Sequence, residues 1–295
     1  MFAALAALCC WPALAVTPLS ASAFEGWLVT THSGNDVQWF SAAGEFKKEL
    51  VTPGSGGLDE ARGVTIGPDG DLYVASAQKK LSQILRYRPT GVFVGIFARG
   101  GTMNHPYAVV FGPDGNLYAS GQNDDAVSRF NGKTGAFMDT FVPPGSGGLK
   151  TIRDLVFAPN GDLLVASRDT NSILRYSSTG QPLGAFVAEK SGGLKKPIQL
   201  AFGPDGDLYV GSSGNSAVLR YNGKTGKFIG VFVPTGDHGL ASPSGLAFDP
   251  TNGDLLVASR LSNQVLRYDR EGKFIGVFID RKDLDTPEFI VPWGK

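Results

Sequence analysis

The chain has 295 residues, of which 42% are hydrophobic and 18% charged, and its 27 basic and 27 acidic residues give a formal net charge of +0. A neutral chain has no general electrostatic attraction to nucleic acid or to an anionic membrane, and we expect neither as a partner. The 40 glycines and 18 prolines indicate many short elements joined by tight turns.

Residues 1–23 differ from the rest of the chain because they are apolar and carry no charge. Ala21-Ser22-Ala23 fits the small-residue cleavage site of a secretory signal. The segment predicts a secreted or periplasmic protein, or a membrane anchor if it is retained. Both cysteines, Cys9 and Cys10, lie in it, so residues 24–295 contain no cysteine for a disulfide.

A turn motif recurs through residues 24–295 at spacings of 45, 46, 45 and 47 residues. Its copies are GPDGD, GPDGN, APNGD, GPDGD and DPTNGD, whose second glycines are Gly70, Gly115, Gly161, Gly206 and Gly253. Around each turn lie an apolar run before it and three strand-like runs after it, such as DLYVAS, QILRY and FVGIF. Four short strands repeated at this period are typical of a β-propeller blade.

The two ends of the chain together supply a sixth unit. Residues 27–31, 37–40 and 46–51 match the second, third and fourth strands of a unit, and residues 288–292 match a first strand. We therefore predict an all-β fold, a six-bladed β-propeller of four-stranded antiparallel blades over residues 24–295. Pairing of the C-terminal strand with the N-terminal strands would close the ring and remove exposed edges.

The pattern P-x-G-(apolar)₃-x-P-D-G-x-L-Y-V-A, followed by N-x-(I/V)-L-R-Y, resembles the NHL-repeat propellers. It is also similar to the related streptogramin-lyase-like and SMP-30/gluconolactonase-like families. The resemblance covers essentially all of residues 24–295 and implies the propeller fold. It leaves the function open, because these propellers include both enzymes and binding modules.

Positions that repeat in most blades are interpreted as structural. Asp69 and its equivalents are interpreted as turn residues. They are not interpreted as metal ligands, because the same metal site would have to recur around the ring. A second repeated column consists of arginines, whose stems we expect to pack between blades and whose heads we expect to reach carbonyls or acids. These arginines are Arg86, Arg129, Arg175, Arg220 and Arg267.

Positions that break the repeat are the candidates for function. In a propeller, the residues that open each first strand and those that follow each second strand ring the mouth of the central channel. The candidate ligand-binding residues are Arg62, Tyr107, Arg153, Asp154, Arg168, Gln199, Ser244, Arg260 and Glu288. Because four arginines can converge on an anion, we expect a binding module for an anionic small molecule, a glycan or a protein segment. We also expect the protein to be a monomer.

An alternative hypothesis is a lyase or lactonase that holds a divalent cation (Ca, Mg or Zn) at the same mouth. Its ligands would be Asp154, Glu288 and His105. The start of the first strands, where amidating lyases of this fold carry histidines, holds no histidine, and the W-F-T-E strand end of streptogramin lyases is replaced by serines or threonine. No P-loop, GxGxxG or GxSxG motif is present, so no catalytic residue is assigned. A purely structural interaction protein is the third possibility.

Overall fold

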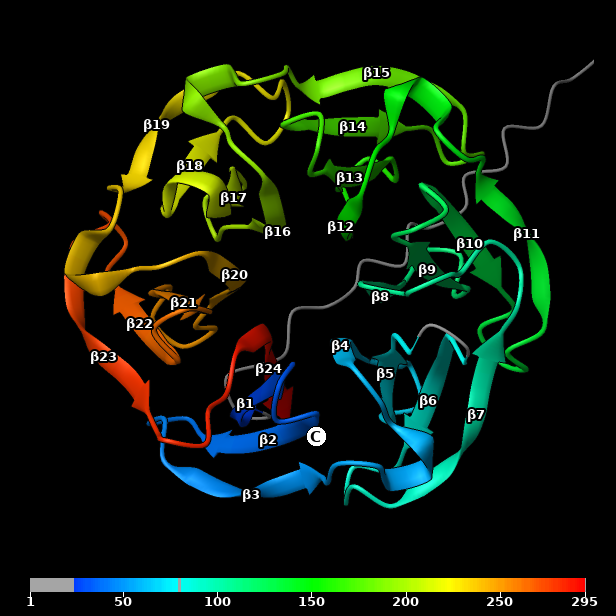
Figure 1. The fold of residues 1–295 in the computed structure, drawn as a ribbon. Coiled ribbons are helices and arrows are strands. Elements are labelled where there is room, and N and C mark those ends of the chain that lie inside the picture. Colours follow the sequence, from blue (N-terminus) through cyan, green and yellow to red (C-terminus); the bar gives the residue numbers. More distant parts are fainter. Residues whose placement is uncertain (1–23, 79–80, 295) are drawn as a thin grey trace, which may run out of the picture.

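The computed structural model describes residues 24–78 and 81–294, and these form a ring of six four-stranded antiparallel sheets (Figure 1). The first blade consists of β24 (Pro287–Gly294), β1 (Phe24–Thr31), β2 (Asp36–Ser41) and β3 (Phe46–Val51). The second consists of β4 (Ala61–Ile66), β5 (Leu72–Ser76), β6 (Gln83–Tyr87) and β7 (Phe93–Arg99). The third consists of β8 (Val109–Phe111), β9 (Leu117–Gly121), β10 (Ala126–Phe130) and β11 (Phe137–Val142).

The fourth blade consists of β12 (Ile152–Phe157), β13 (Leu163–Ser167), β14 (Ser172–Tyr176) and β15 (Pro182–Val187). The fifth consists of β16 (Pro197–Phe202), β17 (Leu208–Ser212), β18 (Ala217–Tyr221) and β19 (Phe228–Val233). The sixth consists of β20 (Pro243–Phe248), β21 (Leu255–Ser259), β22 (Gln264–Tyr268) and β23 (Phe274–Asp280). Short 3₁₀ turns are η1 (Ser55–Gly57), η2 (Ser146–Gly148), η3 (Ser191–Gly193), η4 (Ser213–Asn215) and η5 (Asp237–Gly239).

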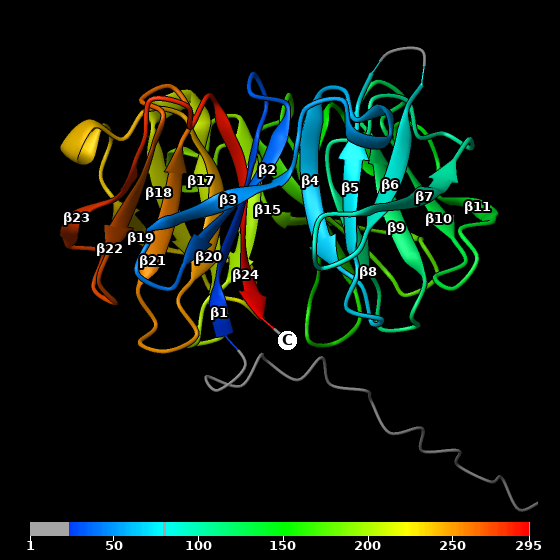
Figure 2. The ribbon, with the colours of Figure 1, turned by 90° about the horizontal axis from the view of Figure 1, so that it is seen from below.

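The ring closes as predicted, through the last strand of the chain. The first blade has the strand order β24-β1-β2-β3, so its innermost strand comes from the C-terminal end. β24 pairs antiparallel with β1, and Val29 lies opposite Ile290. Figure 2 shows the two strands side by side, with the C-terminal end on the face opposite to the links that enter each first strand. The predicted six-bladed fold is confirmed.

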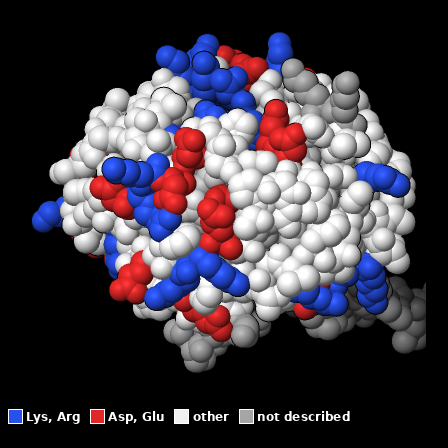
Figure 3. Space-filling view, turned by 60° about the horizontal axis from the view of Figure 1, so that its bottom comes forward, with Lys and Arg blue, Asp and Glu red and all other residues white. Residues whose placement is uncertain are grey.

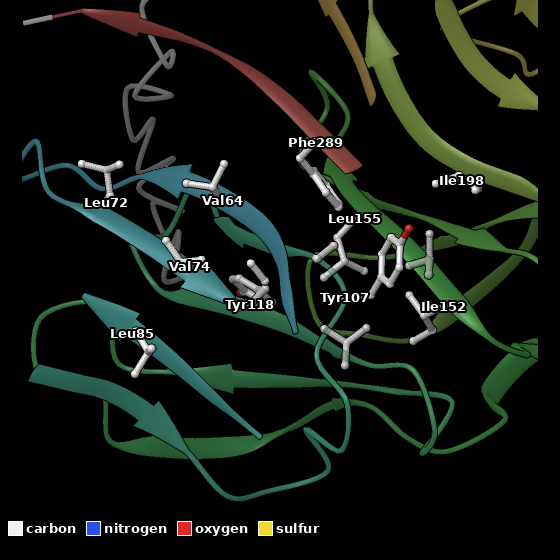
Figure 4. Close-up of a cluster of buried hydrophobic side chains, with 14 of the residues drawn as sticks. Val64, Leu72, Val74, Leu85, Tyr107, Tyr118, Ile152, Leu155, Ile198 and Phe289 are labelled. Atoms are coloured by element: carbon white, nitrogen blue, oxygen red, sulfur yellow. The ribbon is translucent and has the colours of Figure 1, made fainter. Parts of the chain in front are cut away.

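Aromatic side chains fill the space between neighbouring blades. Tyr73 makes edge-to-face contacts with Phe97 and Phe111, at ring-centroid distances of 4.7 and 4.9 Å. Tyr118 and Tyr209 repeat this arrangement in later blades. Edge-to-face pairs add to the stabilisation from buried area. Nearer the channel, Figure 4 shows Tyr107, Leu155 and Phe289 meeting in one buried cluster.

The repeated turn is structural, as predicted. Gly70 has φ of 80°, a left-handed conformation that favours glycine. Asp69 accepts hydrogen bonds from the Asp71 amide and the Tyr73 hydroxyl, and Arg86 donates to both acids at 2.6 Å. The other arginines of this column also pair with carboxylates, so the expected role of their heads is confirmed. These turns lie on the lower face in Figure 2.

The predicted export segment, residues 1–23, lies outside the described residues. Among residues 24–78 and 81–294, no helix has the length and apolar character needed to cross a membrane.

Candidate functional site

The backbone at the mouth is set by a left-handed residue before each first strand. These six residues have φ between 51° and 56°, and they are Glu60, His105, Thr151, Lys196, Ser242 and Thr286. Side chains of the preceding blade hold the links in place; for example, Asp125 accepts from the Thr151 amide at 2.5 Å. Such sparsely populated conformations persist where the surroundings enforce them, often at functional sites. The same backbone geometry thus recurs at all six links that enter a first strand.

A bulge then directs the side chains at the start of the first strands. The pairing of first and second strands shifts register between Ala61 and Val64, between Ile152 and Leu155, and between Pro197 and Leu200. A bulge leaves residues unpaired and turns their side chains in new directions. Each bulge leaves two residues unpaired. The first of the two lines a cavity at the mouth; these residues are Arg62, Arg153 and Ile198. The second contacts the next blade; these residues are Gly63, Asp154 and Gln199.

The cavity at the mouth has a volume of about 170 Å³. Its lining residues are Arg62, Tyr107, Gln122, Arg153, Arg168, Ile198, Ser213, Ser242 and Arg260. Within the described part of the chain, the lining contains no acidic residue. The structure thus brings together all four arginines and the tyrosine of the candidate set.

Glu288 lies just beneath these arginines and is fully buried. Its Oε1 atom accepts from Arg62 Nη1 and from Arg260 Nε, both at 2.8 Å. Its Oε2 atom accepts from the Tyr107 hydroxyl. Charge-assisted bonds of this kind offset the desolvation of a buried carboxylate. Glu288 therefore neutralises part of the charge of the arginines and does not line the cavity.

The ring of Tyr107 contacts two of the cations. The guanidinium carbon of Arg153 is 4.4 Å from the Tyr107 ring centroid, and that of Arg62 is 5.3 Å away. The negative face of an aromatic ring attracts such cations. Burial and the Glu288 carboxylate raise the pKa of the Tyr107 hydroxyl, which stays protonated. Burial lowers the pKa of Arg153, and its Nε atom is buried without a hydrogen-bond partner among the described residues.

Three candidate residues face away from the cavity and join blades. Asp154 accepts from the Leu200 amide at 2.8 Å, and Gln199 accepts from the Leu246 amide at 2.5 Å. Ser244 donates to the Pro287 carbonyl at 2.6 Å. Each bond connects the innermost strand of one blade to that of the next. Burial raises the pKa of Asp154 to about 7. These residues have a structural role that accounts for their polarity.

The three metal-ligand candidates do not form a cluster. Asp154 faces the fifth blade, Glu288 is surrounded by Arg62, Arg260 and Tyr107, and His105 Nδ1 lies 3.4 Å from a carboxylate oxygen of Glu60. Across residues 24–78 and 81–294, no group of three or more His, Cys, Asp or Glu side chains is arranged to hold a metal ion.

The other two histidines, His32 and His238, are not among the lining residues of the cavity. His32 Nε2 is 3.4 Å from Arg62 Nη2, and burial together with Arg62 lowers the pKa of His32. His238 lies on η5 and stacks on Phe274, with ring centroids 4.0 Å apart.

The candidate set lacks four lining residues: Gln122, Ile198, Ser213 and Ser242. Gln122 and Ser213 directly follow second strands, and Ile198 opens a first strand, so the repeat alignment places all three at the mouth. Ser242 immediately precedes a first strand and lies one step outside the positions that the alignment considers.

Comparisons with known proteins define the fold. No protein-family model and no curated protein matches the chain in sequence. Among solved structures, a chain of the nidogen/laminin complex has a TM-score of 0.70 at 16% identity, covering 90% of this chain and 97% of that chain. A protein of unknown function from Bacteroides caccae has a TM-score of 0.67 at 16% identity, covering 91% and 98%.

Virginiamycin B lyase from Staphylococcus aureus has a TM-score of 0.64 at 17% identity, covering 92% of this chain and 90% of that chain. Identities this low establish a shared fold and no shared activity. The structural neighbours thus include both a lyase and a chain of a protein complex. The chain is a six-bladed β-propeller, and it shares this fold with streptogramin B lyases and with a chain of the nidogen/laminin complex.

Proposed function

We propose that this protein is an exported binding module that holds an anionic ligand at the mouth of its central channel. One observation carries the proposal: four arginines, from the second, fourth and sixth blades, line a single cavity whose described lining contains no acid. Convergent guanidiniums match the oxygens of carboxylates and phosphates, and concave clefts with a few converging polar groups are the usual binding sites of proteins.

The energetics of the arginines support a bound anion. Arg62 is only 7% exposed, so water screens its charge poorly. Glu288 offsets one charge for Arg62 and Arg260 together, and Arg153 forms no ion pair with a described carboxylate. A half-buried cation without a counter-ion is costly, and an anion entering the cavity would remove that cost.

The positive mouth is a local feature of the surface. On the face drawn in Figure 3, basic and acidic side chains are interspersed over the wall of the ring, with broad uncharged areas between them. The sequence as a whole is neutral. Small anions, or an anionic group on a glycan or a protein segment, therefore fit better than an extended polyanion.

Export and a monomeric state complete the proposal. Residues 1–23 would direct the protein to the periplasm or the medium, where a cysteine-free propeller remains stable without disulfides. Mass spectrometry of the mature N-terminus tests the cleavage after Ala23.

The binding proposal is tested by thermal stabilisation. Anions that bind the folded protein raise its melting temperature with concentration. We expect phosphate or carboxylate ligands to stabilise the protein, and Arg153→Ala to abolish the shift. Arg175→Ala is the matched control, because Arg175 pairs with Asp162 on the opposite face. Shifts that survive both Arg62→Ala and Arg153→Ala would exclude the mouth as the site.

Metal analysis of protein purified without chelator distinguishes the alternative. About one tightly bound divalent ion per chain would favour the lyase or lactonase hypothesis.

A further inference from the structure

The positive charge at the mouth exceeds what its carboxylates neutralise by two units. Arg62, Arg153, Arg168 and Arg260 contribute four positive charges to the lining. Glu288 is paired with Arg62 and Arg260, and Asp169 is paired with Arg168 at 2.6 Å, which supplies two negative charges. The excess of two charges matches a dianion better than a monoanion.

The arginines approach the cavity from three directions. Arg62 lies on β4 of the second blade, Arg153 and Arg168 belong to the fourth blade, and Arg260 follows β21 of the sixth. These blades alternate around the ring, so the backbone segments that carry the arginines lie at roughly equal steps about the channel axis (Figure 1). The heads of Arg62 and Arg260 meet at Glu288 Oε1. A planar carboxylate is satisfied by a single guanidinium fork from one side. Arginines that reach one cavity from three alternate blades suit a group with several equivalent oxygens.

From this arrangement we infer that the mouth is a receptor for a phosphate monoester group, bound end-on. The three terminal oxygens would face Arg62, the Arg153 and Arg168 pair, and Arg260. The ester oxygen would point along the channel axis toward solvent. The hydroxyls of Ser213 and Ser242 and the amide of Gln122 complete the polar lining.

The size of the cavity limits how much of the ligand is enclosed. A volume of about 170 Å³ accommodates the phosphate group and a few further atoms or waters, so most of a larger organic group would lie outside the rim. The inference rests on the proposed function, since it names the class of anion that the same cavity binds. Free phosphate and a phosphorylated molecule share this chemistry.

Isothermal titration at pH 8 tests the inference with four probes: inorganic phosphate, phenyl phosphate, malonate and acetate. At this pH a phosphate monoester is a dianion, because its second pKa is about 6. We expect both phosphates to bind at least about tenfold more tightly than malonate, a dianion without tetrahedral geometry, and acetate, a monoanion.

Variants locate the binding. Arg153→Gln and Arg260→Gln should each weaken phosphate binding about tenfold or more, and Arg153→Lys should restore part of it. Arg175→Gln, on the opposite face, should bind as the unaltered protein does. Circular dichroism establishes that each variant is folded before titration.

The other outcomes separate the two proposals. If malonate or acetate binds as tightly as phosphate, the phosphate inference is wrong and the anion-binding proposal stands. If phosphate binds but phenyl phosphate does not, the end-on arrangement is wrong. If no probe binds, both the inference and the proposed function fail.

Discussion

The guanidinium of Arg62 donates a 2.8 Å hydrogen bond to the buried carboxylate of Glu288, which lies 226 residues further along the chain. Arg62 belongs to β4, and Glu288 belongs to β24, the strand that closes the ring. One ion pair thus connects the lining of the cavity to the closure of the propeller. Changes at Glu288 should consequently affect both stability and ligand binding.

Replacing Glu288 with Gln should destabilise the protein by about 3 kcal/mol, because it leaves two partly buried guanidiniums without their shared counter-charge. The same variant should bind anions more tightly, since the mouth gains one uncompensated positive charge. Urea unfolding measures the first effect, and titration with inorganic phosphate measures the second.

The exposed ion pair between Lys47 and Glu45 provides the control for Glu288. Lys47→Ala should change the free energy of unfolding by less than about 1 kcal/mol, as is usual for surface pairs. If Glu288→Gln is equally mild and leaves anion affinity unchanged, the charge balance that we assign to the mouth is incorrect.

The Tyr107 hydroxyl should contribute more to stability than the other buried tyrosine hydroxyls. Tyr107 donates to a buried carboxylate, whereas Tyr176 donates to the backbone carbonyl of Ser146. Hydrogen bonds to charged groups contribute about 1.5–3 kcal/mol, against about 1 kcal/mol for neutral pairs. We therefore expect Tyr107→Phe to cost about twice as much unfolding free energy as Tyr176→Phe in urea titrations. Equal costs would mean that the bond to Glu288 is not strengthened by charge.

The fold could be predicted because its determinants recur. Gly70 and its equivalents mark the same left-handed turn in five of the six blades, and the arginines of the repeated column pair with carboxylates in the same five. The split first blade was recognisable because residues 288–292 carry the pattern of a first strand, which the pairing of Val29 with Ile290 confirms. Because the same pattern recurs in successive blades, the strands and turns assigned in one blade could be checked against those of the others.

The site could be predicted only in part, because strand alignment gives position along a blade and not the direction of a side chain. Arg153 and Asp154 are adjacent in sequence, yet one lines the cavity and the other bonds to the next blade. The bulge between Ile152 and Leu155 separates them, and it leaves no sequence pattern of its own. Glu288 was expected among the ligand-binding residues, whereas the structure buries it against Arg62 and Arg260, through contacts between blades that the alignment of strands does not predict.

Asp154 should make the stability of the propeller depend on pH. Burial raises the pKa of Asp154 to about 7, whereas the carboxyl titrates at about 3.9 in an unfolded chain. Between these pH values the folded state binds more protons than the unfolded state, so the free energy of unfolding should fall as the pH rises from about 4 to about 7. The loss is a few kcal/mol, at most about 4 kcal/mol for a shift of this size.

The variant Asp154→Asn isolates this effect, because other groups titrate in both proteins. Urea unfolding at several pH values measures the free energy of unfolding of both proteins. We expect the value for Asp154→Asn, relative to that of the unaltered protein, to increase as the pH rises. A difference that stays constant from pH 4 to pH 8 would mean that Asp154 keeps an ordinary pKa in the folded protein.

Removing residues 284–295 should destabilise the propeller more than any single substitution. The deletion takes away the innermost strand of the first blade, exposes the backbone of β1 and removes the buried side chains of Leu284, Phe289, Ile290 and Trp293. An open edge and the lost apolar contacts both favour unfolding and aggregation. We expect a melting temperature lower by at least about 10 °C, or no cooperative transition, in differential scanning calorimetry. Deletion of Lys295 alone is the control and should leave the transition in place. A truncated protein that melts at the original temperature would show that the ring does not depend on β24 for its closure.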